Sequence, residues 1–250
     1  MNRTVLITGA ALRLGNAIAR ALAGAGWDVV VHARSSVAQA DALCADLAAC
    51  GVRAWRVTGD LLADGGPQTV FDAAVASAGR IDALVNNASV FERQPLASAR
   101  AADFERQWLI NALAPILLTQ RLAGHLAARH ASGSAVNLLD QRITRPGAGA
   151  IPYLLSKKAL EAFTLSAALE FAPALRVNAV APGAVLPPSG AVAGEPAGAF
   201  PLEARPTAEQ VADAVRYLLG ADAVTGQILY VDGGQHLDGA GDRRHAPSFT

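Results

Sequence analysis

The chain has 250 residues, and its 21 Lys plus Arg side chains balance 21 Asp plus Glu side chains, so its formal net charge is zero. This balance argues against a protein that binds nucleic acid or an anionic membrane surface through a basic face. Hydrophobic residues make up 52% and charged residues 17% of the chain, a composition that excludes intrinsic disorder. No apolar run reaches the roughly 18 residues that a membrane helix needs. We therefore expect one folded domain over residues 1–238, followed by a polar tail at residues 239–250.

Cysteine use and the first residues favour a reducing compartment. Cys44 and Cys50 stand six residues apart without a partner histidine cluster, which fits neither a disulfide framework nor a zinc site. The opening residues enter a strand pattern at once and show no signal peptide. We expect a cytoplasmic protein without a bound metal.

Short β-branched runs alternate with Ala- and Leu-rich helical stretches along the chain. Strands are predicted at residues 4–8, 27–32, 53–58, 83–86, 135–139, 176–181 and 227–231. This alternation predicts an α/β fold with a seven-stranded parallel sheet and helices on both faces. The sequence therefore predicts a single doubly wound Rossmann domain, with ligands at the carboxyl ends of the strands. Residues 182–206 predict a long loop, with residues 184–206 as a substrate lid.

The first strand leads into a turn that contains two glycines. Gly9 and Gly15 flank five residues, and a helix is predicted over residues 16–25. Glycines at such a turn let backbone N–H groups approach a phosphate, which the helix dipole also attracts. The spacing differs from G-x-G-x-x-G, so an ordinary turn is the alternative. The position after the first strand favours a dinucleotide site.

The second strand ends without the acid that NAD-binding proteins place near the ribose. Arg34 stands 19 residues after Gly15, Ser35 follows it, and residues 29–36 contain no acid. A guanidinium and hydroxyl groups suit a 2′-phosphate, so the sequence favours NADP(H). A solvated arginine before a helix is the alternative.

Residues after the third and fourth strands are expected to line the same crevice. Asp60 and Leu61 follow the third strand, and Asn87, Ala88 and Ser89 follow the fourth. The Asp60 carboxylate could accept a hydrogen bond from an adenine amino group or cap the next helix. Both interpretations stay open from the sequence.

Tyr153 and Lys157 lie four residues apart on a helix predicted over residues 151–171, so they share one helix face. An ammonium beside a phenol stabilises the phenolate and lowers the pKa of the phenol. The chain has 19 Arg but only two Lys, Lys157 and Lys158, which supports a specific role for a lysine here. Two surface residues on a helix are the alternative.

The chain resembles the short-chain dehydrogenase/reductase family through motifs that occur in the family's order. They are T-G-x5-G, N-N-A at residues 86–88, Asn111, Y-x-x-x-K and Pro182-Gly183. The resemblance implies one Rossmann domain, usually in a homotetramer, that uses NAD(P)(H). It implies Tyr153 as the catalytic acid, and Lys157 as the group that holds the ribose and lowers the pKa of the tyrosine. Asn111 would hold a water in a proton relay, and Pro182 and Gly183 would contact the cofactor.

The chain departs from this family where a serine is usual on the fifth strand. Asp140 stands there, 13 residues before Tyr153. An ionised aspartate would repel an alkoxide that forms on a ketone, but it suits a substrate with N–H donors. It could also deliver a proton if its pKa were raised. A second departure is the missing threonine in residues 184–188, where the family has a nicotinamide contact.

The Asp-Tyr-Lys set is similar to the pteridine reductase and dihydromonapterin reductase branch of the family. Residues 9–15 resemble its G-A-x-x-R-[LI]-G motif, which adds Arg13 and Leu14 to the cofactor site. Residues 86–91 resemble N-N-A-S-x-F, in which the ring of Phe91 would stack on the pterin. The resemblance implies a substrate site made of Arg13, Ser89, Phe91, Asp140 and Tyr153.

Structural roles remain the alternatives for three of these residues. Phe91 could be a core residue, Arg13 could form a surface ion pair, and Asp140 could pair with Arg142 or Arg145. Burial of Phe91 in the core would favour the structural role over the ligand site, and the alternatives for Arg13 and Asp140 stay open from the sequence.

The sequence as a whole predicts an NADPH-dependent enzyme that reduces a pterin-like C=N bond. Tyr153, or Asp140 through a water, would protonate the ring nitrogen. Dihydromonapterin, dihydrobiopterin and dihydrofolate are candidate substrates. One rival is a general carbonyl or alcohol oxidoreductase. A second rival is a non-catalytic NADP(H)-binding sensor, which typically lacks the tyrosine or the lysine.

Overall fold

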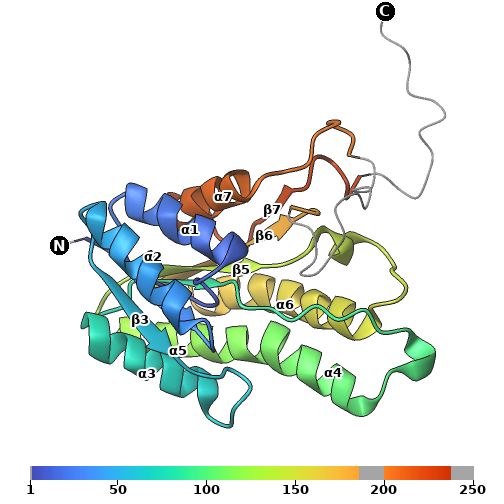
Figure 1. Cartoon of the computed structure of the whole chain (residues 1–250), viewed down its shortest axis with the longest axis horizontal. Helices are drawn as coiled ribbons and strands as arrows, with labels where there is room; N and C mark the ends of the chain where they lie inside the picture. The colour runs from blue at the N-terminus through green and yellow to red at the C-terminus, as the bar shows by residue number, and fades with distance from the viewer. Residues whose placement is uncertain (1, 186–199, 238–250) are drawn as a thin grey trace, which may run out of the picture.

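A parallel sheet of seven strands lies at the centre of the molecule (Figure 1). The computed structural model describes residues 2–185 and 200–237. The strands are β1 (Thr4–Ile7), β2 (Asp28–Ala33), β3 (Ala54–Thr58), β4 (Ala83–Asn86), β5 (Gly133–Leu138), β6 (Leu175–Pro182) and β7 (Ile228–Val231). Their order in the sheet is β3-β2-β1-β4-β5-β6-β7, and every pairing is parallel. The predicted fold class is confirmed, and each strand end lies within two residues of its predicted position.

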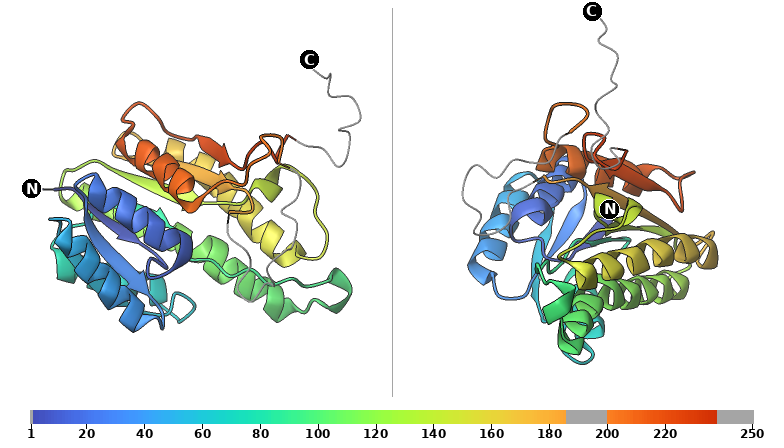
Figure 2. Two further views of the ribbon diagram at one scale, coloured as in Figure 1. Left: turned by 45° about the horizontal axis from the view of Figure 1, so that its top comes forward. Right: turned by 90° about the vertical axis from the view of Figure 1, so that its right-hand side faces the viewer.

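Helices cover both faces of the sheet, as the two views of Figure 2 show. They are α1 (Arg13–Gly24), α2 (Val37–Ala49), α3 (Gly66–Ala78), α4 (Ala101–Trp108), α5 (Ala114–Ala128), α6 (Ile151–Glu170) and α7 (Ala208–Gly220). Helices α1, α2 and α7 pack into the apolar core on one face, and α3, α5 and α6 pack into the core on the other. None of the helices in the described part of the chain is long and apolar enough to cross a membrane.

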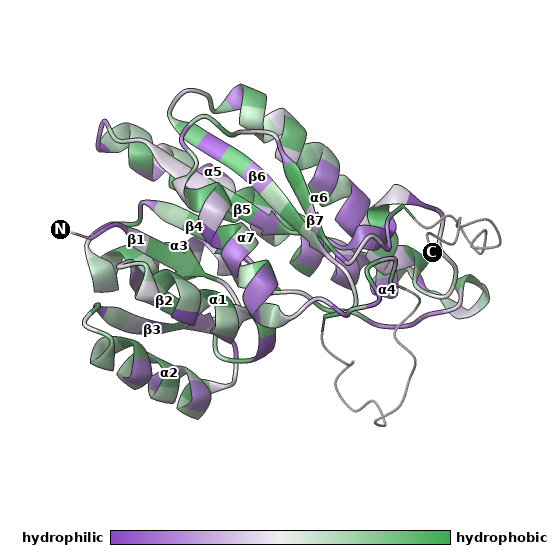
Figure 3. Ribbon diagram, turned by 90° about the horizontal axis from the view of Figure 1, so that it is seen from above, coloured by the Kyte–Doolittle hydropathy of each residue, from purple (hydrophilic) through white to green (hydrophobic). Residues whose placement is uncertain are grey.

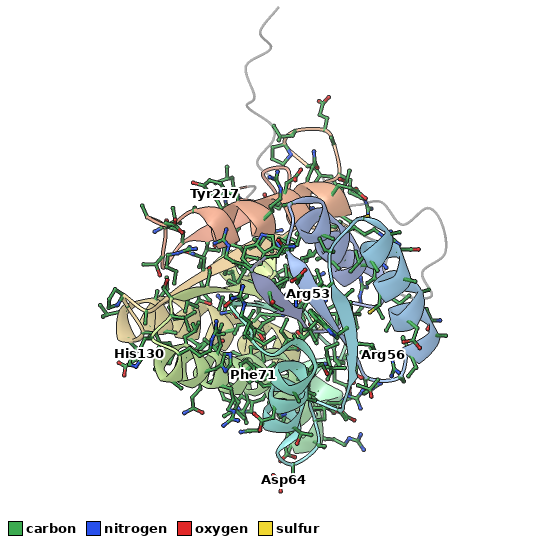
Figure 4. All side chains as sticks on the ribbon, turned by 90° about the vertical axis from the view of Figure 1, so that its left-hand side faces the viewer. Arg53, Arg56, Asp64, Phe71, His130 and Tyr217 are labelled. Atoms are coloured by element: carbon green, nitrogen blue, oxygen red, sulfur yellow. The ribbon has the colours of Figure 1, made fainter. Side chains whose placement is uncertain are left out.

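Alternation along the strands explains how one sheet supplies two cores. Val29 and Val31 of β2 face the α1 side, whereas Val30 between them faces the α3 side. Both sides are apolar, so strands such as β1 are nearly continuous hydrophobic runs. Figure 3 shows green along much of the sheet, with purple stretches in β6. Exposed side chains such as Asp64, His130 and Tyr217 project at the periphery of Figure 4.

The strand order reverses at β1, which lies between β2 and β4. The chain therefore leaves β1 and β4 toward opposite faces, and a crevice opens at their carboxyl ends. Ligands of doubly wound sheets bind at this point. The fold thus brings the Gly9 turn beside the Asn87 segment.

A buried chain of polar groups fixes α6 against the sheet. The Nδ2 amide of Asn86 donates to Oδ1 of Asn137 at 2.8 Å, and Nδ2 of Asn137 donates to Oγ1 of Thr164 at 2.9 Å. Buried polar groups that are paired in this way specify one arrangement of their elements. Since α6 carries Tyr153 and Lys157, this chain of hydrogen bonds sets the depth at which both enter the site.

Two local features differ from the sequence prediction. Helix α1 begins at Arg13 and not at residue 16, because Gly15 in its first turn lets the helix pack directly on the preceding loop. Helices α4 and α5 are joined through one π-helical turn, Leu109–Leu113, which contains Asn111. Single π turns within helices are frequent at functional sites.

Two predicted segments lie partly or wholly outside the described residues. The expected lid at residues 184–206 includes residues 186–199, and the expected tail covers residues 239–250. The domain boundary at residue 238 remains a prediction.

Candidate active site

The glycine turn after β1 is closed to any larger side chain. Gly9 has a φ of +63°, a left-handed conformation that favours glycine. A Cβ atom on Gly15 would lie 2.4 Å from the carbonyl oxygen of Gly9 and 2.7 Å from Nδ2 of Asn87. Both glycines are therefore needed for the loop to lie close against α1. The backbone N–H groups of the loop then lie at the start of this helix.

The end of β4 is tied to this turn by Thr8 and Asn87. The hydroxyl of Thr8 accepts hydrogen bonds from the backbone N–H groups of Asn87 and Ala88, both at 2.9 Å. The Nδ2 group of Asn87 donates to the carbonyls of Thr8 at 2.8 Å and Gly9 at 3.1 Å. The motifs from the first and fourth strands thus form one rigid unit.

His32 holds the same turn from the other side. The backbone N–H of Gly9 donates to Nδ1 of His32 at 3.2 Å, and Nε2 of His32 lies 3.1 Å from the carbonyl oxygen of Gly59. Nδ1 acts as an acceptor, so the proton of the neutral ring lies on Nε2 and is donated to Gly59. Burial lowers the pKa of His32 below its ordinary value of 6.5, which favours this neutral form.

A cleft of about 420 Å³ lies over this unit. Ten of the predicted cofactor residues line it: Gly9, Arg13, Leu14, Gly15, Arg34, Asp60, Leu61, Asn87, Ala88 and Ser89. Ser35 does not line it. The Oδ1 atom of Asp60 accepts from the backbone N–H of Leu62 at 2.9 Å, so Asp60 has a local turn contact as well as a place in the cleft.

Two arginines line the cleft, and each has an unusual feature. Arg34 is exposed at the end of β2, and within residues 2–185 and 200–237 its side chain has no hydrogen-bond or ion-pair partner. Arg13 has a φ of +54°, a left-handed conformation that is unfavourable for an arginine. Such strain is typical of functional turns.

The chemical end of the site lies at the carboxyl end of β5 and the start of α6. The Tyr153 hydroxyl donates to Oδ2 of Asp140 at 3.0 Å, and Oδ1 of Asp140 accepts from the backbone N–H of Arg142 at 2.9 Å. The ammonium of Lys157 donates to the carbonyl of Leu138 at 2.7 Å. Tyr153 and Lys157 are only 6% and 3% exposed, so neither is the surface residue of the alternative interpretation.

The expected lowering of the Tyr153 pKa by Lys157 is wrong. Burial raises the pKa of Tyr153 well above its usual value near 10, and the adjacent Asp140 carboxylate raises it further. The Lys157 ammonium lies 5.9 Å from the centroid of the Tyr153 ring and is bonded to the Leu138 carbonyl. Burial lowers the pKa of Lys157 to about 8, against the opposing effect of Asp140. Tyr153 is therefore held in its protonated form.

Phe91 is not a core residue, because 36% of its surface is exposed. Its ring meets that of Tyr153 edge to face, with centroids 4.9 Å apart and an interplanar angle of 80°. The guanidinium of Arg142 lies over the Phe91 ring at 4.9 Å. Phe91 thus places an aromatic surface beside the Tyr153–Asp140 pair.

The side chain of Asn111 joins the two ends of the site. Its Oδ1 atom accepts from the Ser89 hydroxyl and the Val90 N–H, both at 2.9 Å, and its Nδ2 group donates to the Val90 carbonyl and to Gln107. The side-chain amide is fully used by these partners. The relay water expected at Asn111 remains a prediction.

Pro182 ends β6, and Gly183 continues the same edge of the sheet. The N–H of Gly183 donates to the carbonyl of Val231 at 3.0 Å, and a Cβ on Gly183 would lie 2.7 Å from Oε1 of Gln235. The contact that these two residues would make with a cofactor stays a prediction.

Comparisons with known proteins decide the family. A family model described as enoyl-(acyl carrier protein) reductase, one of the short-chain dehydrogenases/reductases, matches residues 9–236. The chain belongs to the short-chain dehydrogenase/reductase family. Its members bind NAD(P)(H), so the resemblance in the sequence is confirmed at this level.

Among the relatives of this short-chain oxidoreductase are enzymes with different substrates. The chain is 37% identical to pteridine reductase 1 from Leishmania tarentolae over 93% of this chain and 96% of the relative. It is 36% identical to a putative ketoacyl reductase 2 of granaticin polyketide synthesis from Streptomyces violaceoruber, over 93% and 95%. The solved structure of FolM alternative dihydrofolate reductase 1 from Brucella canis, complexed with NADP, is similar with a TM-score of 0.87 and 32% identity, over 96% and 97%.

Three contacts at this short-chain oxidoreductase site were not predicted from the sequence. They are the bonds of the Thr8 hydroxyl to residues 87 and 88, the bonds of the His32 ring, and the contact of Arg142 with Phe91. These contacts join segments that are far apart in sequence. The signal for His32 was a polar side chain directly after the apolar run Val29–Val31 of β2.

We predict that His32→Gln makes the protein less sensitive to acid. Because the folded-state pKa of His32 is lowered, the unfolded state binds more protons below about pH 6.5, so the free energy of unfolding falls as pH falls through that value. Glutamine keeps an acceptor and a donor but does not titrate in this range. Urea denaturation from pH 7.5 to 5.0 measures the difference.

His130→Gln is the matched control, because His130 is exposed and lies far from the turn in sequence. Its stability should follow the wild-type pH dependence. An equally steep loss of stability in His32→Gln and wild-type protein would contradict the assignment of a neutral, buried His32.

Proposed function

We propose that the protein uses NADPH to reduce a C=N bond in a flat, pterin-like heterocycle. The observation that carries the proposal is the hydrogen bond from Tyr153 to Asp140, where the family usually has a serine. When bound, NADPH supplies the hydride for the carbon of that bond.

The glycine turn and the cleft fit a dinucleotide. A Cβ on Gly15 would fill the space between α1 and the Gly9 turn, and the exposed backbone lies at the start of a helix. Arg34 at the end of β2 is exposed, lines the cleft and has no partner within the described residues. Its guanidinium supports a preference for the 2′-phosphate of NADP(H) over NAD(H).

We predict that Arg34→Ala weakens NADPH binding by at least about tenfold, since a charge-assisted hydrogen bond contributes about 1.5–3 kcal/mol. NADH binding should change by less than about twofold. Fluorescence titration of the protein with each nucleotide measures both dissociation constants without a substrate. Arg20→Ala is the control, because Arg20 is an exposed arginine that pairs with Asp46 away from the cleft. Equal affinity of the wild-type protein for NADH and NADPH would contradict this role of Arg34.

Asp140 makes the site a poor match for a ketone. A carboxylate beside the reacting atom repels the alkoxide that hydride addition to a carbonyl would form. The same carboxylate accepts hydrogen bonds from the N–H groups of an amino-substituted heterocycle. We therefore propose that the atom bonded to the reacting carbon is a nitrogen and not a carbonyl oxygen.

Tyr153 is proposed to supply the proton that this nitrogen needs. Its raised pKa keeps the phenol protonated at neutral pH. A nitrogen that gains electrons during reduction is strongly basic and takes a proton even from a weak acid. Oxidation in the reverse direction would need a Tyr153 phenolate beside Asp140, so the proposed direction is reduction.

Phe91 is proposed as the platform for the flat ring. Its surface is open, and aromatic pairs at such distances contribute about 0.5–1.5 kcal/mol beyond burial. Ser89 and Val90, which precede Phe91, are held by Asn111. Asn111 thus acts as a positioning residue for the platform.

A general carbonyl reductase is the second candidate. The observation in its favour is the 36% identity to a putative ketoacyl reductase, close to the value for the pteridine reductase. In that case the replacement of the usual serine by Asp140 would have no effect on the reaction.

The assembly and the location remain predictions. A homotetramer is proposed, and the exposed apolar residues Leu155, Leu165 and Leu169 lie toward one side of α6, where a second copy could cover them. A cytoplasmic location is proposed from the cysteine pattern.

We predict that wild-type protein oxidises NADPH with dihydromonapterin or dihydrobiopterin and that Asp140→Ser loses this activity by about tenfold to 100-fold, because a hydrogen bond to a charged acceptor contributes about 1.5–3 kcal/mol. Asp140→Ser should at the same time gain activity on simple ketones, because the repulsion of the alkoxide is removed. This gain shows that the variant is folded. Absorbance at 340 nm measures both reactions.

Two results would contradict the proposal in different ways. Ketone reduction without pterin reduction by the wild-type protein would support the carbonyl reductase. Unchanged pterin reduction by Asp140→Ser would show that the carboxylate is not used.

A further inference from the structure

The side chain of Arg142 contacts Phe91 and Asp140, the two residues that are proposed to bind the flat ring and the N–H groups of the substrate. Its guanidinium carbon is 4.9 Å from the centroid of the Phe91 ring, and its Nε atom is 3.7 Å from Oδ1 of Asp140. The side chain is 42% exposed. Within the described residues its guanidinium donates no hydrogen bond, and the ion pair with Asp140 at 3.7 Å is its polar contact. The guanidinium is thus held weakly, beside Phe91 and Asp140.

A guanidinium and the amino-pyrimidine edge of a pterin share their shape and part of their donor pattern, although the guanidinium alone carries a charge. Both are flat, both place one carbon between three nitrogens, and both direct N–H groups toward an acceptor in their plane. Both pack face-on against an aromatic ring. An arginine that touches Phe91 and Asp140 therefore makes the contacts that such a substrate would make.

We propose that Arg142 occupies part of the substrate slot and is displaced by the guanidine-like edge of a flat heterocycle, so that Arg142 determines how tightly this class of substrate binds. This inference rests on the proposed function. It names the recognised feature, which is a flat edge with N–H donors.

Displacement of Arg142 is easy for two physical reasons. A half-exposed ion pair and an exposed cation–π contact each contribute little. The backbone N–H of Arg142 donates to Oδ1 of Asp140 at 2.9 Å and does not move with the side chain. Asp140 therefore stays in place after the guanidinium leaves.

Position-specific variants test this inference. In Arg142→Ala the competitor is absent, so we expect the Kd of biopterin for the NADP⁺-loaded protein to fall about threefold to tenfold. The KM for dihydrobiopterin should fall by the same factor, with kcat within about twofold of wild type. Equilibrium dialysis and NADPH oxidation measure these quantities. Arg142→Lys, which keeps the charge without the flat group, should give intermediate values.

Arg106→Ala is the matched control. Arg106 has a similarly exposed side chain that pairs with Glu92 at 3.4 Å, and within residues 2–185 and 200–237 its guanidinium lies over no aromatic ring. This variant should bind biopterin like the wild-type protein.

The remaining outcomes separate this inference from the reaction. Tighter biopterin binding by Arg142→Ala without any reduction of dihydrobiopterin would support Arg142 and overturn the proposed reaction. Weaker binding would show that the guanidinium helps to hold the ligand, and unchanged binding would show that it does not compete. A fall in kcat alone would show that it acts through Asp140. Each of the last three results, or no binding to either protein, overturns the inference.

Discussion

The hydrogen bond from the Tyr153 hydroxyl to the Asp140 carboxylate is the interaction on which the rest of the site depends. Both groups lie where β5 ends and α6 begins, and burial together with the carboxylate keeps the phenol protonated. In the proposed reaction, this protonated phenol donates its proton to the strongly basic nitrogen of the substrate. The surrounding structure serves to hold this pair: the Asn86–Asn137–Thr164 chain fixes α6 to the sheet, and the turn after β5 fixes Asp140 through the backbone of Arg142.

The site has two ends that a short segment connects. The cleft over the Gly9 turn belongs to the first half of the sheet, and the Tyr153–Asp140 pair belongs to the second half. Residues 87–91 run between them: Asn87 is bonded to the Gly9 turn, Ser89 to Asn111, and Phe91 contacts Tyr153. These contacts connect the Gly9 turn to Phe91 and so fix the position of Phe91 relative to the cleft.

Local patterns predicted the sheet and ten residues of the cleft, because strand periodicity and turn glycines are properties of neighbouring residues. The ten cleft residues all follow strand ends, which parallel topology brings to one edge. The electrostatics of Tyr153 could not be predicted in the same way. A spacing of four residues on a helix places Lys157 near Tyr153. Only the folded chain shows that the Lys157 ammonium donates to the Leu138 carbonyl and that the Tyr153 hydroxyl donates to Asp140. The contact of Arg142 with Phe91 and the bonds of the His32 ring were not predicted for the same reason, since the partners come from other segments.

The most direct test of this account is the ionisation of Tyr153 itself, followed by NMR of protein labelled with tyrosine at ¹³Cζ. The Tyr153 signal is assigned by its loss in Tyr153→Phe, and the pH is raised from 6 to 11. The account predicts that the wild-type signal remains that of a phenol beyond about pH 10, where free tyrosine ionises, and that Asp140→Asn moves the transition to lower pH. A wild-type Tyr153 that ionises below that value, or a transition that Asp140→Asn leaves unchanged, would contradict the central role of the Tyr153–Asp140 pair.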